Sequence, residues 1–176
     1  TGAEALDFDM LDGKILLNID TEEEGTAIAG CAGGERIHLR IPYEKNKSEY
    51  DTAVEILVTG LKGGHSGSDI HLGRGNANVI LARWLDMLRQ EMSFDLIHIH
   101  GGGMHNAIPR LAKAKIAFHQ ESLAILEDIK NAFQKTLSEE LVETDGDVTL
   151  EIERLNEVEE VFNDECKDAV IDAILL

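Results

Sequence analysis

The chain has 176 residues, of which 43% are hydrophobic, and a formal net charge of −18 at pH 7. This length and apolar content suit one ordinary domain with a buried core. The acidity argues against nucleic acids and anionic membrane surfaces as partners, because both require a basic face. With neither an apolar run of about 18 residues nor a signal-peptide pattern, we expect a cytoplasmic protein without a membrane span.

The first 45 residues carry two short apolar stretches. Residues Lys14 to Ile19 form an apolar run that ends at Asp20, which predicts a buried strand with an acid at its carboxyl end. Residues 25–41 predict one or two short strands around two adjacent glycines. A polar, turn-like stretch follows and places a domain boundary near residue 45.

From residue 46 onward, hydrophobic residues recur with the periods of regular secondary structure. Alternation of apolar and polar residues predicts four strands, and spacings of three or four residues predict two amphipathic helices. The order β-α-β-β-α-β predicts an α+β fold in which two helices cover one face of a four-stranded antiparallel sheet, as in ferredoxin-like folds. The strands are expected at residues 52–60, 94–102, 112–120 and 147–155, and the helices at residues 76–92 and 122–142.

A glycine-rich segment, Gly60–Asn78, joins the first of these strands to the first helix. It does not fit a phosphate-binding loop, which needs a Lys where His65 stands. It does not fit a serine-hydrolase elbow either, because Gly64–Ser68 lacks the last glycine of G-x-S-x-G. The segment is therefore a structured loop that presents a functional His65, or the same loop with a histidine that has no role. Periodicity does not decide between these alternatives.

Four motifs extend over most of the chain in a fixed order: LLNIDTEEEG, GCAGG, GLKGGHSGSDIHLGRGNAN and GGGMHNAIPR. Together they resemble the aminoacyl-histidine dipeptidases, the Xaa-His branch of the M20 zinc metallopeptidases. The resemblance runs from Thr1 to about Asn163. It implies a catalytic domain that holds two zinc ions and a lid domain that closes over a dipeptide substrate and forms homodimer contacts.

This resemblance implies a division of the chain into three parts. Residues 1–45 correspond to the tail of the catalytic, metal-binding segment, residues 46–163 to the lid or dimerisation domain, and residues 164–176 to the start of a further lid helix. The chain begins without Met, and its last residues predict a helix that has just begun, with Asp164 as its N-cap. We therefore expect a piece of a longer protein.

The resemblance also implies roles for individual residues. Asp20 matches a zinc-binding aspartate, and a carboxylate at a strand's carboxyl end suits that role. His65 matches a lid histidine that stabilises the oxyanion of the transition state, in its own or a partner's active site. Asn106 matches a residue that contacts the substrate. Arg110 is either a ligand of the substrate carboxylate or a surface charge.

Other polar residues have simpler interpretations. Asn76 stands where the first helix should begin, and we expect it to cap that helix. His98 and His100 alternate on one strand, a spacing that suits either a metal site or two partly exposed sheet residues.

The function implied by the resemblance is zinc-dependent hydrolysis of Xaa-His dipeptides, with zinc-activated water and a glutamate base. The base and most metal ligands of the family would lie outside residues 1–176, so we expect negligible activity from this chain alone. Two alternatives remain open. One is an M20 metallohydrolase for another small peptide or an N-acyl amino acid, and the other is a non-enzymatic ferredoxin-like module for dimerisation or ligand binding.

Overall fold

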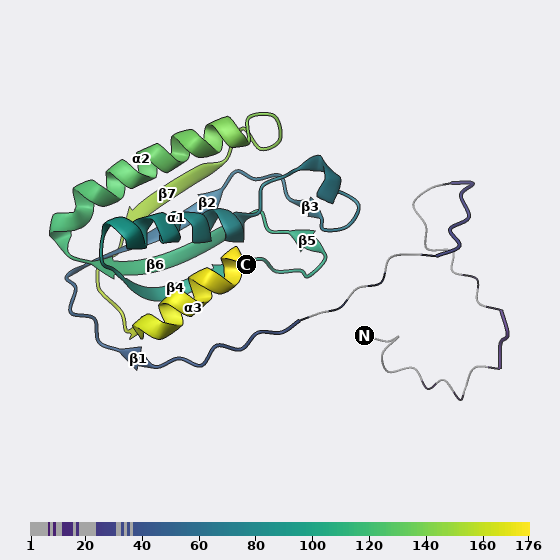
Figure 1. The fold of residues 1–176 in the computed structure, drawn as a ribbon, viewed down its shortest axis with the longest axis horizontal. Helices are drawn as coiled ribbons and strands as arrows, with labels where there is room; N and C mark the ends of the chain where they lie inside the picture. The colour runs from purple at the N-terminus through teal and green to yellow at the C-terminus, as the bar shows by residue number, and fades with distance from the viewer. Residues whose placement is uncertain are drawn as a thin grey trace. The chain divides into compact units, whose positions relative to one another are not determined.

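The computed structural model describes residues 7, 9, 12–15, 17, 24–30, 33, 35 and 37–176. It divides the chain into two compact units, Thr1–His38 and Leu39–Leu176. All strands and α-helices of the described residues belong to the second unit (Figure 1). None of the helices in the described part of the chain has the length and apolar character needed to cross a membrane.

The second unit is built on the β-α-β-β-α-β order. Its elements are β2 (Thr52–Thr59), α1 (Ala77–Glu91), β4 (Asp95–Gly101), β6 (Ala112–Phe118), α2 (Leu123–Glu140) and β7 (Thr149–Arg154). The strands form one four-stranded sheet in the order β4-β6-β2-β7, and every neighbouring pair is antiparallel. The α+β, ferredoxin-like fold expected from the sequence is confirmed.

The central strand β2 shows how its alternating sequence serves the fold. Val54, Ile56 and Val58 are at most 1% exposed and belong to the core shared with the helices. Glu55 points to the other face, where it lies opposite Lys115 of β6. One face of the sheet is thus apolar and covered, while the other stays largely polar, as expected for an antiparallel sheet with helices on one side.

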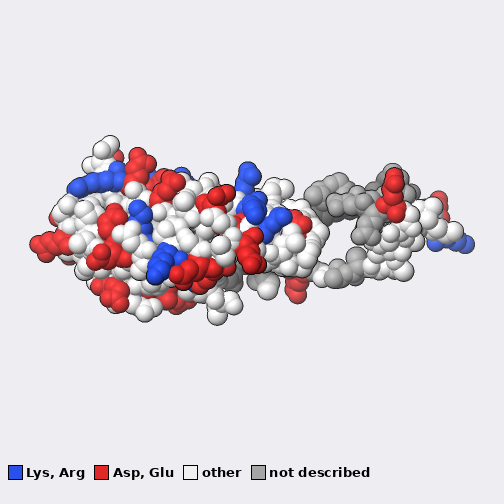
Figure 2. Space-filling model, turned by 90° about the horizontal axis from the view of Figure 1, so that it is seen from above, with Lys and Arg blue, Asp and Glu red and all other residues white. Residues whose placement is uncertain are grey.

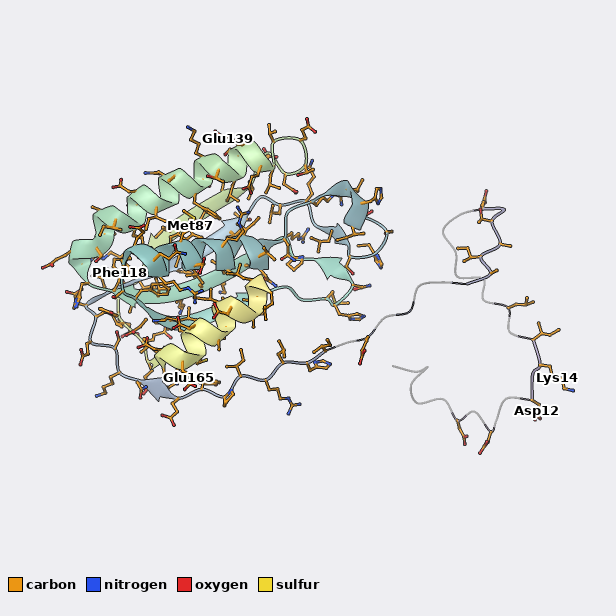
Figure 3. All side chains as sticks on the ribbon, in the orientation of Figure 1. Asp12, Lys14, Met87, Phe118, Glu139 and Glu165 are labelled. Atoms are coloured by element: carbon orange, nitrogen blue, oxygen red, sulfur yellow. The ribbon has the colours of Figure 1, made fainter. Side chains whose placement is uncertain are left out.

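The helices bury the apolar stripes that their sequences predict. In α1 the expected stripe is at most 1% exposed and belongs to the core: Ala77, Leu81, Trp84, Leu85 and Leu88. In α2, Leu126, Phe133 and Leu137 are equally buried. On the outer side of the two helices, side chains such as Met87 and Glu139 are exposed (Figure 3).

A third helix, α3 (Asp164–Leu175), lies beside α1 and adds Ile171 to the same core (Figure 1). The prediction that Asp164 caps this helix is wrong by one residue, since Asn163 occupies the N-cap position. The side chain of Asn163 does not cap the helix, because its Oδ1 accepts a hydrogen bond from the backbone N–H of Glu44 at 3.3 Å.

Two further pairs of short strands flank the sheet. β1 (Lys45–Asn46) pairs with β8 (Val161–Phe162), and β3 (Gly64–His65) pairs with β5 (Ala107–Ile108). Val161 of β8 also joins a small apolar cluster on the second face of the sheet. The pairing of β1 with β8 joins a segment near the start of this unit to the segment just before α3.

The strands expected in residues 25–41 are not formed in the described part of that range, residues 25–30, 33, 35 and 37–41. Ile28, Ile37 and Leu39 are 66%, 79% and 70% exposed. A strand needs a partner for its backbone N–H and C=O groups, and no pairing involves these described residues. The expected strand at residues 14–19 and the acid at its end, Asp20, lie largely outside the described residues.

Candidate functional site

Two glycine-rich motifs meet at one end of the sheet (Figure 1). Strands β3 and β5 pair so that His65 lies opposite Ala107, and the backbone N–H of Ser66 donates to the carbonyl of Asn106 at 2.9 Å. The structure therefore brings together His65 and Asn106, which lie about forty residues apart in the sequence. Both side chains are exposed.

The imidazole of His65 is held by the loop that carries it. Its Nδ1 accepts hydrogen bonds from the backbone N–H groups of Gly67 at 3.0 Å and Ser68 at 3.1 Å. A ring nitrogen that accepts carries no proton, so the neutral ring has its proton on Nε2. Nε2 has no hydrogen-bond partner among the described residues, and its N–H is a donor available to a ligand.

Gly67 also sets how closely the ring can approach the backbone. A Cβ at this position would lie 3.2 Å from Cε1 and 3.3 Å from Nδ1 of His65. At these separations the imidazole would have to shift by a few tenths of an ångström. The glycine is therefore part of the geometry that fixes the ring.

Asp69 and Arg74 stabilise the rest of the glycine-rich loop, here defined as residues 60–76. Asp69 Oδ2 accepts the backbone N–H of His65 at 2.9 Å, and Arg74 Nη1 donates to the carbonyl of Gly63 at 2.6 Å. The two side chains lie 3.5 Å apart as an ion pair. Gly64 has a φ of +146°, and a Cβ there would collide with both of these side chains.

A buried carboxylate ties the two ends of this loop together. Asp145 is 1% exposed; its Oδ1 accepts the backbone N–H of Lys62 at 2.7 Å and its Oδ2 that of Gly75 at 2.8 Å. In the sequence, Asp145 is recognisable only as part of the turn before the last strand. Its partners are 83 and 70 residues away in the chain, so no local pattern signals this role.

The start of α1 is joined to the second motif. Asn76 Oδ1 accepts the backbone N–H groups of Asn78 at 3.0 Å and Val79 at 3.4 Å, which confirms the predicted cap. The N–H of Ala77 donates to the carbonyl of Pro109 at 2.8 Å. The helix, the glycine-rich loop and the segment before Arg110 thus form one connected assembly.

Arg110 lines a hollow of about 500 Å³ beside the paired strands, together with Lys62 and His100. His65 and Asn106 are not part of its lining. No carboxylate forms an ion pair with Lys62 or Arg110 in the described part of the chain. Asp and Glu outnumber Lys and Arg, 34 to 16, and do so on the face drawn in Figure 2, so two cations at one hollow suit an anionic ligand.

The described residues do not form a metal centre. They contain no group of three or more His, Cys, Asp or Glu side chains that could hold a metal ion. His98 and His100 are exposed, and their rings stack with centroids 6.4 Å apart. Partial burial of the His98 ring, followed by the positive charge of Lys113, lowers the pKa of His98. Asp20, the predicted zinc ligand, lies outside the described residues.

Residues 56–145 match the family model of the peptidase dimerisation domain. The chain belongs to the M20 peptidase dimerisation domain family. The matched range of this dimerisation domain includes His65, Asn106, Arg110 and Asp145, and it excludes Asp20.

Two relatives of this dimerisation domain have known activities in their names. The chain is 40% identical over 151 residues to the cytosol non-specific dipeptidase of Escherichia coli (strain K12), covering 85% of this chain and 31% of that protein. Its fold is similar to the crystal structure of the aminoacylhistidine dipeptidase from Vibrio alginolyticus, with a TM-score of 0.73 and 32% identity over 77% of this chain and 28% of that one. The resemblance to this branch of the M20 family is confirmed, and the chain spans about a third of these relatives' lengths.

Proposed function

We propose that this chain is the lid of a metal-dependent dipeptidase and presents His65 to the substrate. In this proposal residues 46–163 form the lid, residues 1–45 continue into the metal-binding domain, and residues 164–176 begin a further lid helix. The identity to a dipeptidase over 85% of the chain supports this interpretation. The observation that carries it is the imidazole of His65, which is exposed, held by two backbone N–H groups through Nδ1, and left with Nε2 free of a hydrogen-bond partner among the described residues.

His65 acts in this proposal as a hydrogen-bond donor through Nε2. In the neutral ring, the two backbone N–H groups donated to Nδ1 leave the proton on Nε2. Hydrolysis of an amide places negative charge on the carbonyl oxygen only as the transition state forms. A donor already oriented towards that oxygen stabilises the transition state more than the substrate and therefore raises kcat. The recipient site is that of the same subunit or of a partner.

Asn106 and Arg110 contact the substrate in the same proposal. The side-chain amide of Asn106 can donate to and accept from a peptide unit, and the backbone pairing of Ser66 with Asn106 keeps it beside His65. Arg110, supported by Lys62 and His100 at the hollow, binds the carboxylate of a dipeptide.

Zinc is the metal that we propose for the complete enzyme, with Asp20 as the ligand from this chain. The described residues do not form a metal site by themselves, and in this proposal, which follows the resemblance, the other ligands and the base belong to polypeptide outside residues 1–176. Bound zinc would supply a Lewis acid and an activated water. We also propose that the domain forms a homodimer in the cytoplasm, as its family name suggests, without nucleic-acid or membrane partners.

The substrate range has two candidates. Similarity to the Vibrio aminoacylhistidine dipeptidase favours Xaa-His dipeptides, whereas 40% identity to a non-specific dipeptidase favours a broader set of dipeptides. Substrates with an N-acyl group form a third class that the same lid could serve.

The test uses the complete polypeptide encoded by the open reading frame that contains residues 1–176. Hydrolysis of β-alanyl-histidine, other Xaa-His dipeptides, dipeptides without His and an N-acetyl amino acid is measured with zinc and with a chelator. His65→Ala is expected to lower kcat by about 100- to 1,000-fold with little change in KM. His71→Ala is the matched control, because His71 is an exposed histidine of the same loop, and it should leave kcat unchanged.

The results separate the alternatives. Activity on Xaa-His substrates alone supports the narrow specificity, and equal activity on other dipeptides supports the broad one. Cleavage of the N-acetyl amino acid alone would discard the dipeptidase proposal. Failure to hydrolyse any amide with added metal would favour the non-enzymatic module, and substantial chelator-sensitive turnover by residues 1–176 alone would contradict the proposed division of the site.

A further inference from the structure

The most deeply buried carboxylate in the described residues, that of Asp145, serves the glycine-rich loop. Both oxygens of Asp145 accept backbone N–H groups, one from Lys62 near the start of the loop and one from Gly75 near its end. Burial of a charged group is unfavourable unless hydrogen bonds satisfy it. The carboxylate therefore gains its partners only when the two ends of the loop lie at a fixed separation.

Apart from the pairing of β3 with β5 and the hydrogen bond from Ser66 N–H to the carbonyl of Asn106, the loop has few other interactions that could fix its orientation relative to the sheet. Residues His65 to Ser68 are exposed, and Leu61 is its one buried large apolar side chain. Asp69 and Arg74 stabilise the loop internally, since their partners are His65 and Gly63. The hydrogen bonds of Asp145 differ, because they join the loop to the turn between α2 and β7.

The packing at the base of the loop is tight enough to transmit this constraint. A Cβ on Gly75 would lie 2.7 Å from Leu61 Cδ2 and 3.1 Å from Leu141 Cδ1. The turn itself is braced, as the N–H of Asp145 donates to the carbonyl of Leu141 at 2.8 Å. A rigid support of this kind can keep the imidazole of His65 in place although the supporting residues do not touch the substrate.

We propose that Asp145 is a positioning residue for His65: its buried carboxylate clamps both ends of the glycine-rich loop and thereby sets where the Nε2–H of His65 points. This proposal rests on the role of His65 proposed above. Asp145 itself does not touch the reacting atoms. Its contribution reaches catalysis only through the orientation of the loop, and a displacement of about 1 Å at a reacting group can lower a rate by about a hundredfold.

Asp145→Asn in the complete polypeptide tests the clamp with a nearly isosteric change. The Asn side chain can accept one of the two N–H groups through its oxygen, but its NH₂ group then opposes the other donor. We expect kcat to fall by about 10- to 100-fold with KM changed less than about threefold, since the weakened interaction belongs to the transition state. Asp147→Asn is the matched control, because Asp147 is an exposed acid of the same turn, and it should leave kcat unchanged.

A double-mutant cycle distinguishes positioning from a general structural role. If Asp145 acts through His65, Asp145→Asn should lower kcat little further in the His65→Ala background, so that the two losses are not additive. Equal losses in both backgrounds would overturn the proposal, and so would an unchanged kcat in the single variant. If His65→Ala has no effect while metal-dependent dipeptidase activity persists, the positioning role falls and the dipeptidase assignment stands.

The folded fraction of each variant is measured by thermal melting, and kcat is compared only below the melting midpoint. Asp145→Glu is the second variant, since it retains the charge but displaces the oxygens by one methylene. We expect it to fold and to show the same non-additive loss of kcat. If neither variant folds at any temperature, Asp145 is a folding residue and the positioning proposal is rejected.

Discussion

The helix-covered sheet and the glycine-rich loop are held in place by different physical means. The sheet and its helices share one continuous apolar core, in which each large side chain is surrounded by several others. The loop depends on its short pairing with β5, on the hydrogen bonds of Asp145, Asp69 and Arg74, and on glycines at positions where a Cβ would collide or φ is positive.

This difference has consequences for how each region responds to mutation. Truncating an apolar side chain in the core lowers the stability of the whole unit, because burial of apolar area is the main favourable term in folding. Removing a hydrogen bond from the loop changes local geometry at a site whose function depends on orientation. We therefore expect core variants to affect unfolding most strongly and loop variants to affect activity most strongly.

The largest effect on stability is expected from Phe133→Ala. Phe133 of α2 is 1% exposed, and deleting its ring should lower the free energy of unfolding by about 3–5 kcal/mol. Ile125→Ala on the same helix is the control, because Ile125 is 42% exposed and should cost less than about 1 kcal/mol. Urea unfolding measures both variants. Similar losses would show that α2 does not anchor the core.

Gly60→Ala tests whether backbone geometry at the start of the loop matters as much as apolar packing. Gly60 has a φ of +81°, and a Cβ there would collide with the carbonyl oxygen of Asp147. The expected loss in the free energy of unfolding is about 2–3 kcal/mol, from strain and displacement of the turn. Gly73→Ala is the control, since its φ is +63° but no atom lies within 4 Å. It should cost only about 1 kcal/mol, and equal losses would argue against the steric clash.

Asn76→Ala examines the junction between the loop and the helix. Its side chain caps two backbone N–H groups of α1, and removal of such a cap lowers the free energy of unfolding by about 1 kcal/mol. Asn131→Ala serves as the control, because Asn131 is exposed within α2 and alanine favours the helix. A variant at position 76 that is as stable as the control would mean that the hydrogen bond to Pro109 alone fixes the helix start.

The smallest effect concerns His98 on the uncovered face of the sheet. Burial, followed by the charges of Lys113 and His100, lowers its pKa from the ordinary value of 6.5. The unfolded chain therefore binds this proton more readily than the folded chain, and stability should fall as the pH drops through about 6.5. His98→Gln should flatten this decline in urea titrations between about pH 7.5 and pH 5.5. His71→Gln is the control outside the sheet, and an equal flattening there would contradict the assignment.

Much of the sheet could be predicted from the sequence because its signals are local. Val54, Ile56 and Val58 alternate in β2, and the α1 residues from Ala77 to Leu88 follow the helical period. Each of these patterns depends on residues two to four positions apart. The cap at Asn76 was equally predictable, since a cap acts on the next two or three residues.

The strands expected in residues 25–41 show where such local signals fail. Their apolar residues suggest strands, but a strand also needs a neighbouring strand, and the described residues of that range have none. The N-cap of α3 was misplaced by one residue for a related reason. The side chain of Asn163 accepts a hydrogen bond from the backbone N–H of Glu44, 119 residues away, and does not cap its own helix.

The sequence by itself determined the order of the elements, the buried stripes and, through its motifs, the family and the candidate residues His65, Asn106 and Arg110. Only the tertiary structure decided that β3 pairs with β5, that backbone N–H groups fix the ring of His65, and that Asp145 holds both ends of its loop. The physical reason is the sequence separation over which each kind of interaction acts. Periodicity records which side chains share a face of one element, whereas a hydrogen bond between residues 83 positions apart exists only after the chain has folded.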